Sequence, residues 1–249
     1  MSATTYAQDL STTDDTPRVH REKARRTLTY LLIFAIVMAF SGLLSAYLVS
    51  KGSVDFWVSI RLPMAFYWST AFILLSSVTM QLALVMARRG RSGLTAPLLV
   101  ATLGLGIAFS VSQFKGWSQL HELGNFFSFS KVLQNNGVYG EDYTIARKGV
   151  TLVEAEGRFY LPDDVERTKP LNDEMADQSN AASQYIYVLT ALHLAHLAFG
   201  LLALVLMTVK ALLRRYPATD TIGLWSGSIY WHFLGGLWLI ILSFFVLVH

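Results

Sequence analysis

The chain contains no cysteine, which excludes disulfide bonds, thiolate metal sites and the thioether attachment of a c-type haem. Charge is also scarce: Asp, Glu, Lys and Arg make up 15% of the 249 residues, whereas 53% of the residues are hydrophobic. A composition this apolar and this sparsely charged is not typical of a soluble domain. It indicates a membrane protein.

The motifs of several common enzyme classes are missing too. The sequence has no phosphate-binding glycine loop, no dinucleotide fingerprint, no HExxH and no GxSxG. No pair of carboxylates falls inside an apolar stretch, which argues against an ion pump that works alone. The formal net charge of +3 comes from basic residues beside the apolar stretches, so nucleic acid is not expected as a partner.

Apolar stretches long enough to cross a bilayer dominate what is present. A membrane-spanning helix needs about 20 apolar residues, because its backbone amides must be satisfied within the segment. We therefore expect an all-α polytopic membrane protein, a bundle of five transmembrane helices with an extended outer loop. Pro63 opens the second helix, where a missing amide proton costs little. The predicted spans are 28–49, 62–87, 94–114, 185–207 and 225–248.

Basic residues beside the spans predict their orientation, because lysine and arginine collect on the cytoplasmic side. The polar tail 1–26 is then cytoplasmic, and its composition predicts disorder up to the basic cluster. Residues 27–249 form the membrane domain, which includes a periplasmic loop at 115–184, and the C-terminus is periplasmic. The three clusters are Arg18, Arg21, Lys23, Arg25 and Arg26; Arg88, Arg89 and Arg91; and Lys210, Arg214 and Arg215.

The long outer loop mixes apolar, aromatic and charged residues. Residues 149–161 predict a small β-hairpin with Thr151, Val153 and Phe159 in strands and Glu156-Gly157 at the turn. Between positions 141 and 178 acidic residues outnumber basic ones about two to one. The loop is either a solvated connection or a negative surface that attracts a cationic partner.

Three histidines are the candidate chemical groups within the spans. His193 and His196 are three residues apart and share one helix face, and His232 lies in the last span. His196 and His232 come out at similar depth, so they could hold a haem iron. The alternative is a structural or proton-related role, with the imidazoles hydrogen-bonded between helices.

Small residues and tryptophans complete the candidates. Glycine allows two helix backbones to approach closely in lipid, so the predicted packing positions are Gly42, Gly104, Gly106, Gly200, Gly235 and Gly236. Tryptophan is enriched at the membrane interface. We therefore expect interfacial or lipid contacts at tryptophans near the span ends: Trp57, Trp117, Trp225 and Trp231.

Several of these segments together resemble subunit III of the haem-copper cytochrome c oxidases. "YVLTALHLAHLAFG" (187–200) and "YWHFLGGLWLIILSFF" (230–245) are similar to that family's HxxH and WHFxxxxW helices. "FSGLLSAYL" (40–48), "LPMAFYWSTAFILLSS" (62–77) and "LGLGIAFSVSQFKGW" (103–117), which contains Gln113, match earlier landmarks. "NNGVYG" (135–140) matches the family's lead into the HxxH helix. The resemblance extends from about Leu28 to His249 apart from the insertion at 141–182.

The resemblance implies an accessory, non-catalytic subunit III in the five-helix bacterial form, part of an aa3-type oxidase of the inner membrane. Its partners are then subunits I and II, which hold the haem and copper, and this chain holds phospholipid and supports proton uptake. His193, His196, His232 and Gln113 become packing or proton-related positions and are not metal ligands. The acidic loop is expected to contact subunit II, a cytochrome c or a neighbouring respiratory complex.

This sequence also departs from the family pattern. Three positions where the family usually has acids carry Ile36, Gly116 and Gly235 here, so a proton relay through those carboxylates does not transfer. Two alternatives remain. One is the equivalent subunit of a quinol oxidase or of a nitric oxide reductase. The other is a five-helix b-type cytochrome that serves as a quinone-reactive membrane anchor.

Overall fold

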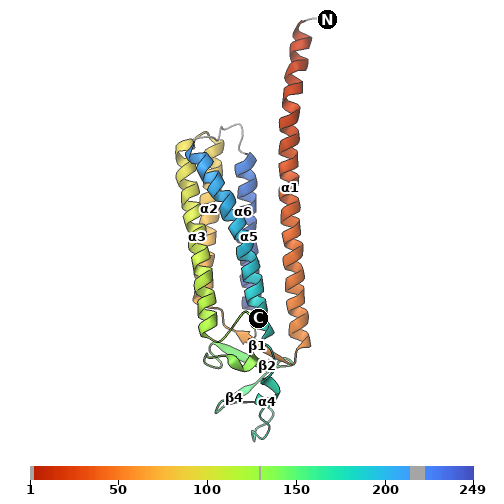
Figure 1. Ribbon diagram of the computed structural model, residues 1–249, viewed down its shortest axis with the longest axis vertical. Helices are drawn as coiled ribbons and strands as arrows, with labels where there is room; N and C mark the ends of the chain where they lie inside the picture. Colours follow the sequence, from red (N-terminus) through yellow and green to blue (C-terminus); the bar gives the residue numbers. More distant parts are fainter. Residues whose placement is uncertain (1–2, 129, 214–221) are drawn as a thin grey trace.

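Five long helices make up most of the structure, a computed structural model that describes residues 3–128, 130–213 and 222–249 (Figure 1). Each has an apolar stretch long enough to cross a membrane, which confirms the predicted fold class of a multi-pass helical membrane protein. The second helix starts directly after Pro63, as predicted. The long helices are α1 (Ala3–Ser53), α2 (Met64–Arg88), α3 (Ser92–Glu122), α5 (Ala181–Leu212) and α6 (Ile222–Val248).

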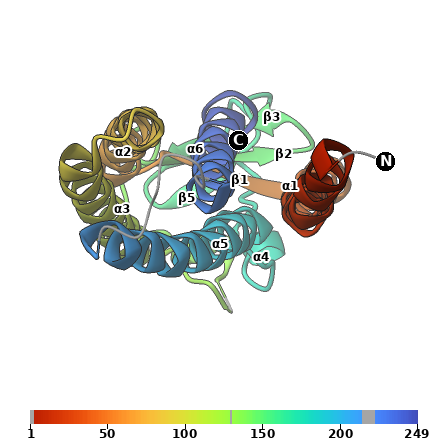
Figure 2. The ribbon, with the colours of Figure 1, turned by 90° about the horizontal axis from the view of Figure 1, so that it is seen from above.

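Four of these helices form a closed bundle. Helix α2 packs along α3 and α6, and α5 packs along α3 and α6, so each helix has two neighbours (Figure 2). Helix α1 lies outside this bundle beside α5 and α6. The fully buried Trp231, Trp238, Phe66 and Phe109 fill the centre of the bundle. We call the end that carries Arg88 the basic end, and the opposite end the loop end.

The polar N-terminal tail differs from the prediction. Residues from Ala3 onward belong to α1, which continues without a break through the predicted boundary at position 26 to Ser53. The sequence contains no glycine before Gly42, so no flexible residue interrupts the helix. Extending an existing helix adds one hydrogen bond per residue and avoids a new nucleus, and the apolar span provides that nucleus. The prediction of a disordered tail was wrong for residues 3–26.

Short strands close the loop end. Strand β2 (Tyr143–Arg147) pairs antiparallel with β1 (Phe56–Ile60) and with β3 (Val150–Thr151) in the order β1-β2-β3. The sheet therefore joins the short connection after α1 to the 141–182 insertion. Phe56, Trp57, Val58 and Ile60 of β1 are buried, so this sheet covers the end of the bundle. Strand β1 was not predicted from the sequence, although its aromatic and β-branched run is typical of a strand.

The predicted hairpin is present in a shorter form. Strands β4 (Val153–Ala155) and β5 (Arg158–Tyr160) pair around Glu156 and Gly157, both of which have positive φ. Thr151 instead pairs with Ala146 across β2 and β3. A second tight turn at Lys148 and Gly149, again with positive φ, separates those two strands. Two short helical turns, η1 (Val132–Gln134) and α4 (Asn172–Met175), complete the loop.

Candidate functional site

Three α2 hydroxyl groups bind the neighbouring helices through one repeated arrangement. Ser69, Thr70 and Ser76 each donate a hydrogen bond to a backbone carbonyl of α2, at distances of 2.7, 3.0 and 2.8 Å. The bond to the helix's own backbone fixes the hydroxyl proton and leaves a lone pair facing outward. The hydroxyl can then accept from another helix.

Each of these three hydroxyl oxygens accepts a hydrogen bond from a neighbouring helix. Trp231 Nε1 of α6 donates to Ser76 Oγ at 3.0 Å, and Trp238 Nε1 donates to Thr70 Oγ1 at 2.9 Å. Gln113 Nε2 of α3 donates to Ser69 Oγ at 2.9 Å. Each such bond between helices in lipid contributes about 1 kcal/mol. Gln113 and Trp231 therefore hold α3 and α6 against α2, and sequence reasoning missed Ser69 and Thr70 because their role depends on the neighbours.

His193 lies in the middle of this core. Its ring packs against Trp238, with ring centroids 5.4 Å apart, and against Phe109, at 5.8 Å. The side chain is fully buried, and both ring nitrogens lack a hydrogen-bond partner among the described residues. Gln113 Oε1 is also buried without a partner in that set. These are two polar groups for which small ordered molecules such as water are suitable partners.

The other two histidines lie elsewhere. His196 Nδ1 lies 2.7 Å from the Leu192 carbonyl of its own helix, and its ring contacts Phe40 of α1. His232 binds Ser77 and Gln81 of α2. His196 and His232 therefore do not face each other as a pair of haem ligands would. His196 faces α1, whereas both ring nitrogens of His232 bind side chains of α2. Among the described residues no cluster of three potential metal ligands occurs.

The glycines differ in how tightly they are packed. A Cβ built on Gly200 would meet Leu234 at 3.1 Å, and one on Gly235 would meet Ile73 at 3.5 Å, so both lie at helix contacts. At Gly42 and Gly236 a Cβ would have no neighbour within 4 Å. Within the described part of the chain, these two positions are not packed against another helix.

Closer contacts occur at three other glycines, of which Gly106 was a predicted packing position and Gly116 and Gly227 were not. A Cβ on Gly106 would lie 2.8 Å from both Leu201 and Trp231. One on Gly116 would lie 2.8 Å from Phe66, and one on Gly227 would lie 2.5 Å from Met207. Only the tertiary structure separates these glycines from exposed ones, because each depends on the large side chain opposite.

The tryptophans do not all lie at an interface. Trp231 is 2% exposed and Trp57 is 4% exposed, so both are core residues, and their expected interfacial role was wrong. Large aromatic rings stabilise the core by burying much apolar area. Trp231 Nε1 also has a hydrogen-bond partner in Ser76, whereas Trp57 Nε1 has none among the described residues. Trp117 is half-buried and donates to Thr190 Oγ1 at 3.0 Å. Trp225 is half-buried at the basic end, under the guanidinium of Arg26 at 5.0 Å.

A cleft of about 790 Å³ separates α1 from α5 and α6 towards the basic end. Leu28, Phe199 and Leu206 form part of its apolar wall, and Arg25 and Lys210 bring two positive charges to it. Long apolar walls suit acyl chains, and basic pockets between helices bind anionic headgroups. The cleft can therefore hold an anionic phospholipid, and His196 and Tyr230 line its polar side.

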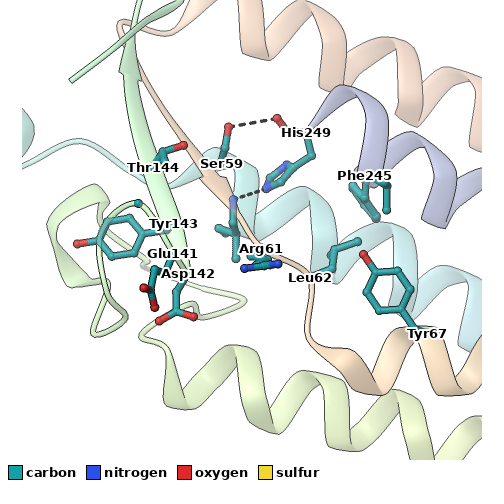
Figure 3. Close-up of a pocket in the computed structure, with 13 residues that line it drawn as sticks. Ser59, Arg61, Leu62, Tyr67, Glu141, Asp142, Tyr143, Thr144, Phe245 and His249 are labelled. Atoms are coloured by element: carbon teal, nitrogen blue, oxygen red, sulfur yellow. Dashed lines mark hydrogen bonds between the residues drawn. The ribbon is translucent and has the colours of Figure 1, made fainter. Parts of the chain in front are cut away.

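A smaller pocket of about 370 Å³ lies at the loop end (Figure 3). One wall carries Arg61 of the β1–α2 connection together with Glu141 and Asp142. The other wall includes Tyr67 of α2 and Phe245 of α6. The pocket thus joins charged groups of the insertion to apolar groups of the bundle.

His249 fixes the end of α6 beside this pocket. Its Nε2 accepts a hydrogen bond from the Ile60 amide at 2.8 Å, and its carbonyl accepts from Ser59 Oγ at 3.1 Å (Figure 3). Since Nε2 accepts, the ring proton lies on Nδ1, which bonds the Tyr47 hydroxyl. Burial, with a smaller contribution from the Lys51 charge, lowers the pKa of His249 to about 3. The ring is neutral and joins α6, β1 and α1.

The insertion carries excess negative charge. Arg147 pairs with Glu174 at 2.7 Å, and Lys148 pairs with Asp55 at 3.5 Å. Several other acids have no ion-pair partner within the described part of the chain: Glu141, Asp142, Glu154, Glu156, Asp163, Glu166 and Asp173. The Asp164 carboxylate accepts from the amides of Lys169 and Thr168, and these bonds lower its pKa. The loop therefore presents a negative surface.

Neither a scan against models of known protein families nor a search of the curated proteins gave a match for this chain.

Proposed function

We propose that this chain is an accessory subunit III of a cytochrome c oxidase in a bacterial inner membrane, with its N-terminus cytoplasmic. Haem and copper belong to the partner subunits I and II, which transfer electrons from cytochrome c to oxygen and move protons. This chain contributes no catalytic residue. Its work is to stabilise the complex, hold phospholipid and support proton uptake.

The observation that carries the proposal is the convergence of the resembling segments. Trp231 of the WHF segment donates to Ser76 of the Leu-Ser-Ser run. Trp238, the second tryptophan of that segment, packs on His193 of the HxxH segment and on Phe109 of the third. Residues that sequence similarity groups together thus form one core, as expected if they were retained to specify a single bundle.

The three positions that lack the family's usual acids limit how this chain could support proton uptake. Ile36 is buried at 3% exposure, and a Cβ on Gly116 would already meet Phe66 at 2.8 Å. Apolar neighbours therefore occupy the space around these two positions. Within the spans, any support for proton uptake by this chain uses polar groups other than carboxylates. His193 and Gln113 are two of the buried groups that have polar atoms without a hydrogen-bond partner among the described residues.

The cleft supports a lipid-binding role, and the insertion supports a docking role. Arg25 and Lys210 can hold the phosphate of an anionic lipid whose chains lie on Leu28 and Phe199. The negative loop end suits a cationic partner, for which a cytochrome c, subunit II or a neighbouring respiratory complex are candidates. Deleting the β4–β5 hairpin should then weaken that association and its dependence on salt.

Affinity purification of the tagged chain from native membranes in mild detergent tests the proposal. Mass identification should find oxidase subunits I and II together with haem and copper in the complex. Recovery with a quinol oxidase or a nitric oxide reductase would assign the chain to the runner-up complexes. A Soret band from the chain expressed alone would contradict the proposal and indicate the b-type membrane anchor.

A further inference from the structure

A hydrogen-bonded chain of three side chains, Ser77, His232 and Gln81, links α2 and α6. His232 Nε2 lies 3.2 Å from Gln81 Oε1, and His232 Nδ1 bonds the Ser77 hydroxyl. A carboxamide oxygen only accepts, so Nε2 carries the ring proton and Nδ1 accepts from Ser77. His232 is thus neutral, and both of its nitrogens are used.

Gln81 is left with unused donors. Its oxygen is held by His232, and its amide nitrogen has two N–H groups with no acceptor among the described residues. The side chain is exposed. Because the bond to His232 fixes the carboxamide, the nitrogen cannot turn back towards the bundle without breaking that bond.

The position of Gln81 makes this arrangement costly in lipid. Arg88 ends α2 seven residues further on, which places Gln81 about 10 Å from the helix end. Helix α2 is about 38 Å long at 1.5 Å per residue, against a hydrocarbon core of about 30 Å, so Gln81 lies within the core. Acyl chains offer no acceptor at this depth, and polar groups there normally face protein.

The surface of α2 and α6 beside these three side chains permits close approach. Gly236 follows His232 by one turn on α6, and a Cβ built there would have no neighbour within 4 Å. Ile240 lies one turn further on and is 58% exposed, while Val78 and Leu82 flank Gln81 on α2. A small residue between larger apolar ones lets a second helix come near, which is how helices pack in membranes.

Other exposed faces lack this combination. The exposed residues in the middle of α3, such as Ile107 and Val111, and of α5, such as Leu202 and Val205, are apolar. Exposed serines on α1 can satisfy their hydroxyls on their own helix. Gln81 is the one exposed carboxamide more than one turn from a helix end in the described spans.

We propose that this surface, formed by Val78, Gln81, Leu82, Gly236 and Ile240, docks a transmembrane helix of a partner protein. That helix presents an oxygen acceptor, a carbonyl, hydroxyl or carboxyl group, to the Gln81 amide. The surface follows from the bilayer and the contacts of Gln81; only the identity of the partner, a subunit of the oxidase, rests on the proposed function. His232 and Ser77 are positioning residues that orient the carboxamide.

Photo-crosslinking in native membranes tests this surface. The full chain carries benzoylphenylalanine at Ile240, or at Val111 on α3 as the matched exposed control. We expect a protein adduct from position 240 whose yield falls about threefold to fifteenfold in the Gln81→Leu variant, the range for one hydrogen bond between helices. Leu75→Val, an apolar change at an exposed position of α2 outside this surface, should leave that yield unchanged.

The outcomes separate the two proposals. A protein adduct that is not an oxidase subunit supports the docking surface and contradicts the proposed function. Lipid adducts alone from position 240, while oxidase subunits still co-purify, would overturn the docking surface and leave the function standing. An adduct to a second copy of this chain, or a yield that Gln81→Leu does not change, would also overturn it.

Discussion

Replacing Gly106 by alanine is expected to destabilise the bundle, whereas the same replacement at Gly104, two residues earlier on α3, should not. A Cβ at position 106 would lie 2.8 Å from both Leu201 and the Trp231 ring. At position 104 a Cβ would meet nothing within 4 Å. Both variants replace glycine by alanine in the same helix, so the difference between their free energies of unfolding measures the effect of packing at position 106.

Two opposing contributions determine how each variant changes the free energy of unfolding. Glycine to alanine in a helix favours folding by up to about 1 kcal/mol at both positions. Overpacking at position 106 costs about 1–3 kcal/mol, because Trp231 is fixed by its bond to Ser76 and cannot withdraw freely. The free energies of unfolding of the two variants should therefore differ by about 1–3 kcal/mol, roughly 5-fold to 150-fold in the equilibrium constant.

Reversible unfolding in mixed micelles, titrated with SDS and followed by tryptophan fluorescence, gives the two values. Gly104→Ala should match or exceed the wild type, and Gly106→Ala should fall below Gly104→Ala. Equal stability of the two variants would refute the packing assigned to Trp231.

Three further predictions concern other parts of the chain. Trp231→Phe and Ser76→Ala should each lower the free energy of unfolding by about 1 kcal/mol, and a double-mutant cycle should show that the two effects are coupled, since they share one hydrogen bond. Folding lowers the pKa of His249 to about 3, so below about pH 6.5 the unfolded chain binds more protons than the folded chain. The contribution of His249 to the free energy of unfolding should therefore be full above that pH and fall by at most about 1.4 kcal/mol per pH unit as the pH drops. Thermal melts at pH 5–7 should show a smaller pH dependence for His249→Gln than for the wild type. Replacing both Arg25 and Lys210 by glutamine should reduce the anionic phospholipid that co-purifies, measured by lipid mass spectrometry, and unchanged lipid content would contradict the role of the cleft.

The spans could be predicted because the bilayer acts on each segment alone. Length, hydropathy and the missing charges identify all five helices without knowledge of their neighbours. Pro63 predicted the start of α2, and the Glu156-Gly157 pair predicted the hairpin, because turn conformation is also a local property. Strand β1 also carries a local signal in its aromatic and β-branched residues, although it was not predicted.

The functional groups were harder to predict, because their roles depend on what lies opposite. Gly106 and Gly104 look alike in the sequence, yet only Gly106 faces a tryptophan. Trp231 and Trp225 are both aromatic residues of the last span, yet one lies in the core and the other on the basic end of α6. Gln81 was not predicted either, although a lone carboxamide within an apolar stretch is itself a sign of a contact with protein.

The sequence by itself determined that this chain crosses the membrane with five helices, because the cost of exposing backbone and charge to hydrocarbon is set residue by residue. The tertiary structure decided which histidine is buried, which glycine lies against a large side chain of another helix and which hydroxyl bridges two helices. It also joined β1 to the distant β2, so that the insertion became part of the bundle's end. These outcomes are relations between segments far apart in the chain, and helix packing in lipid fixes them through close contact and a few hydrogen bonds.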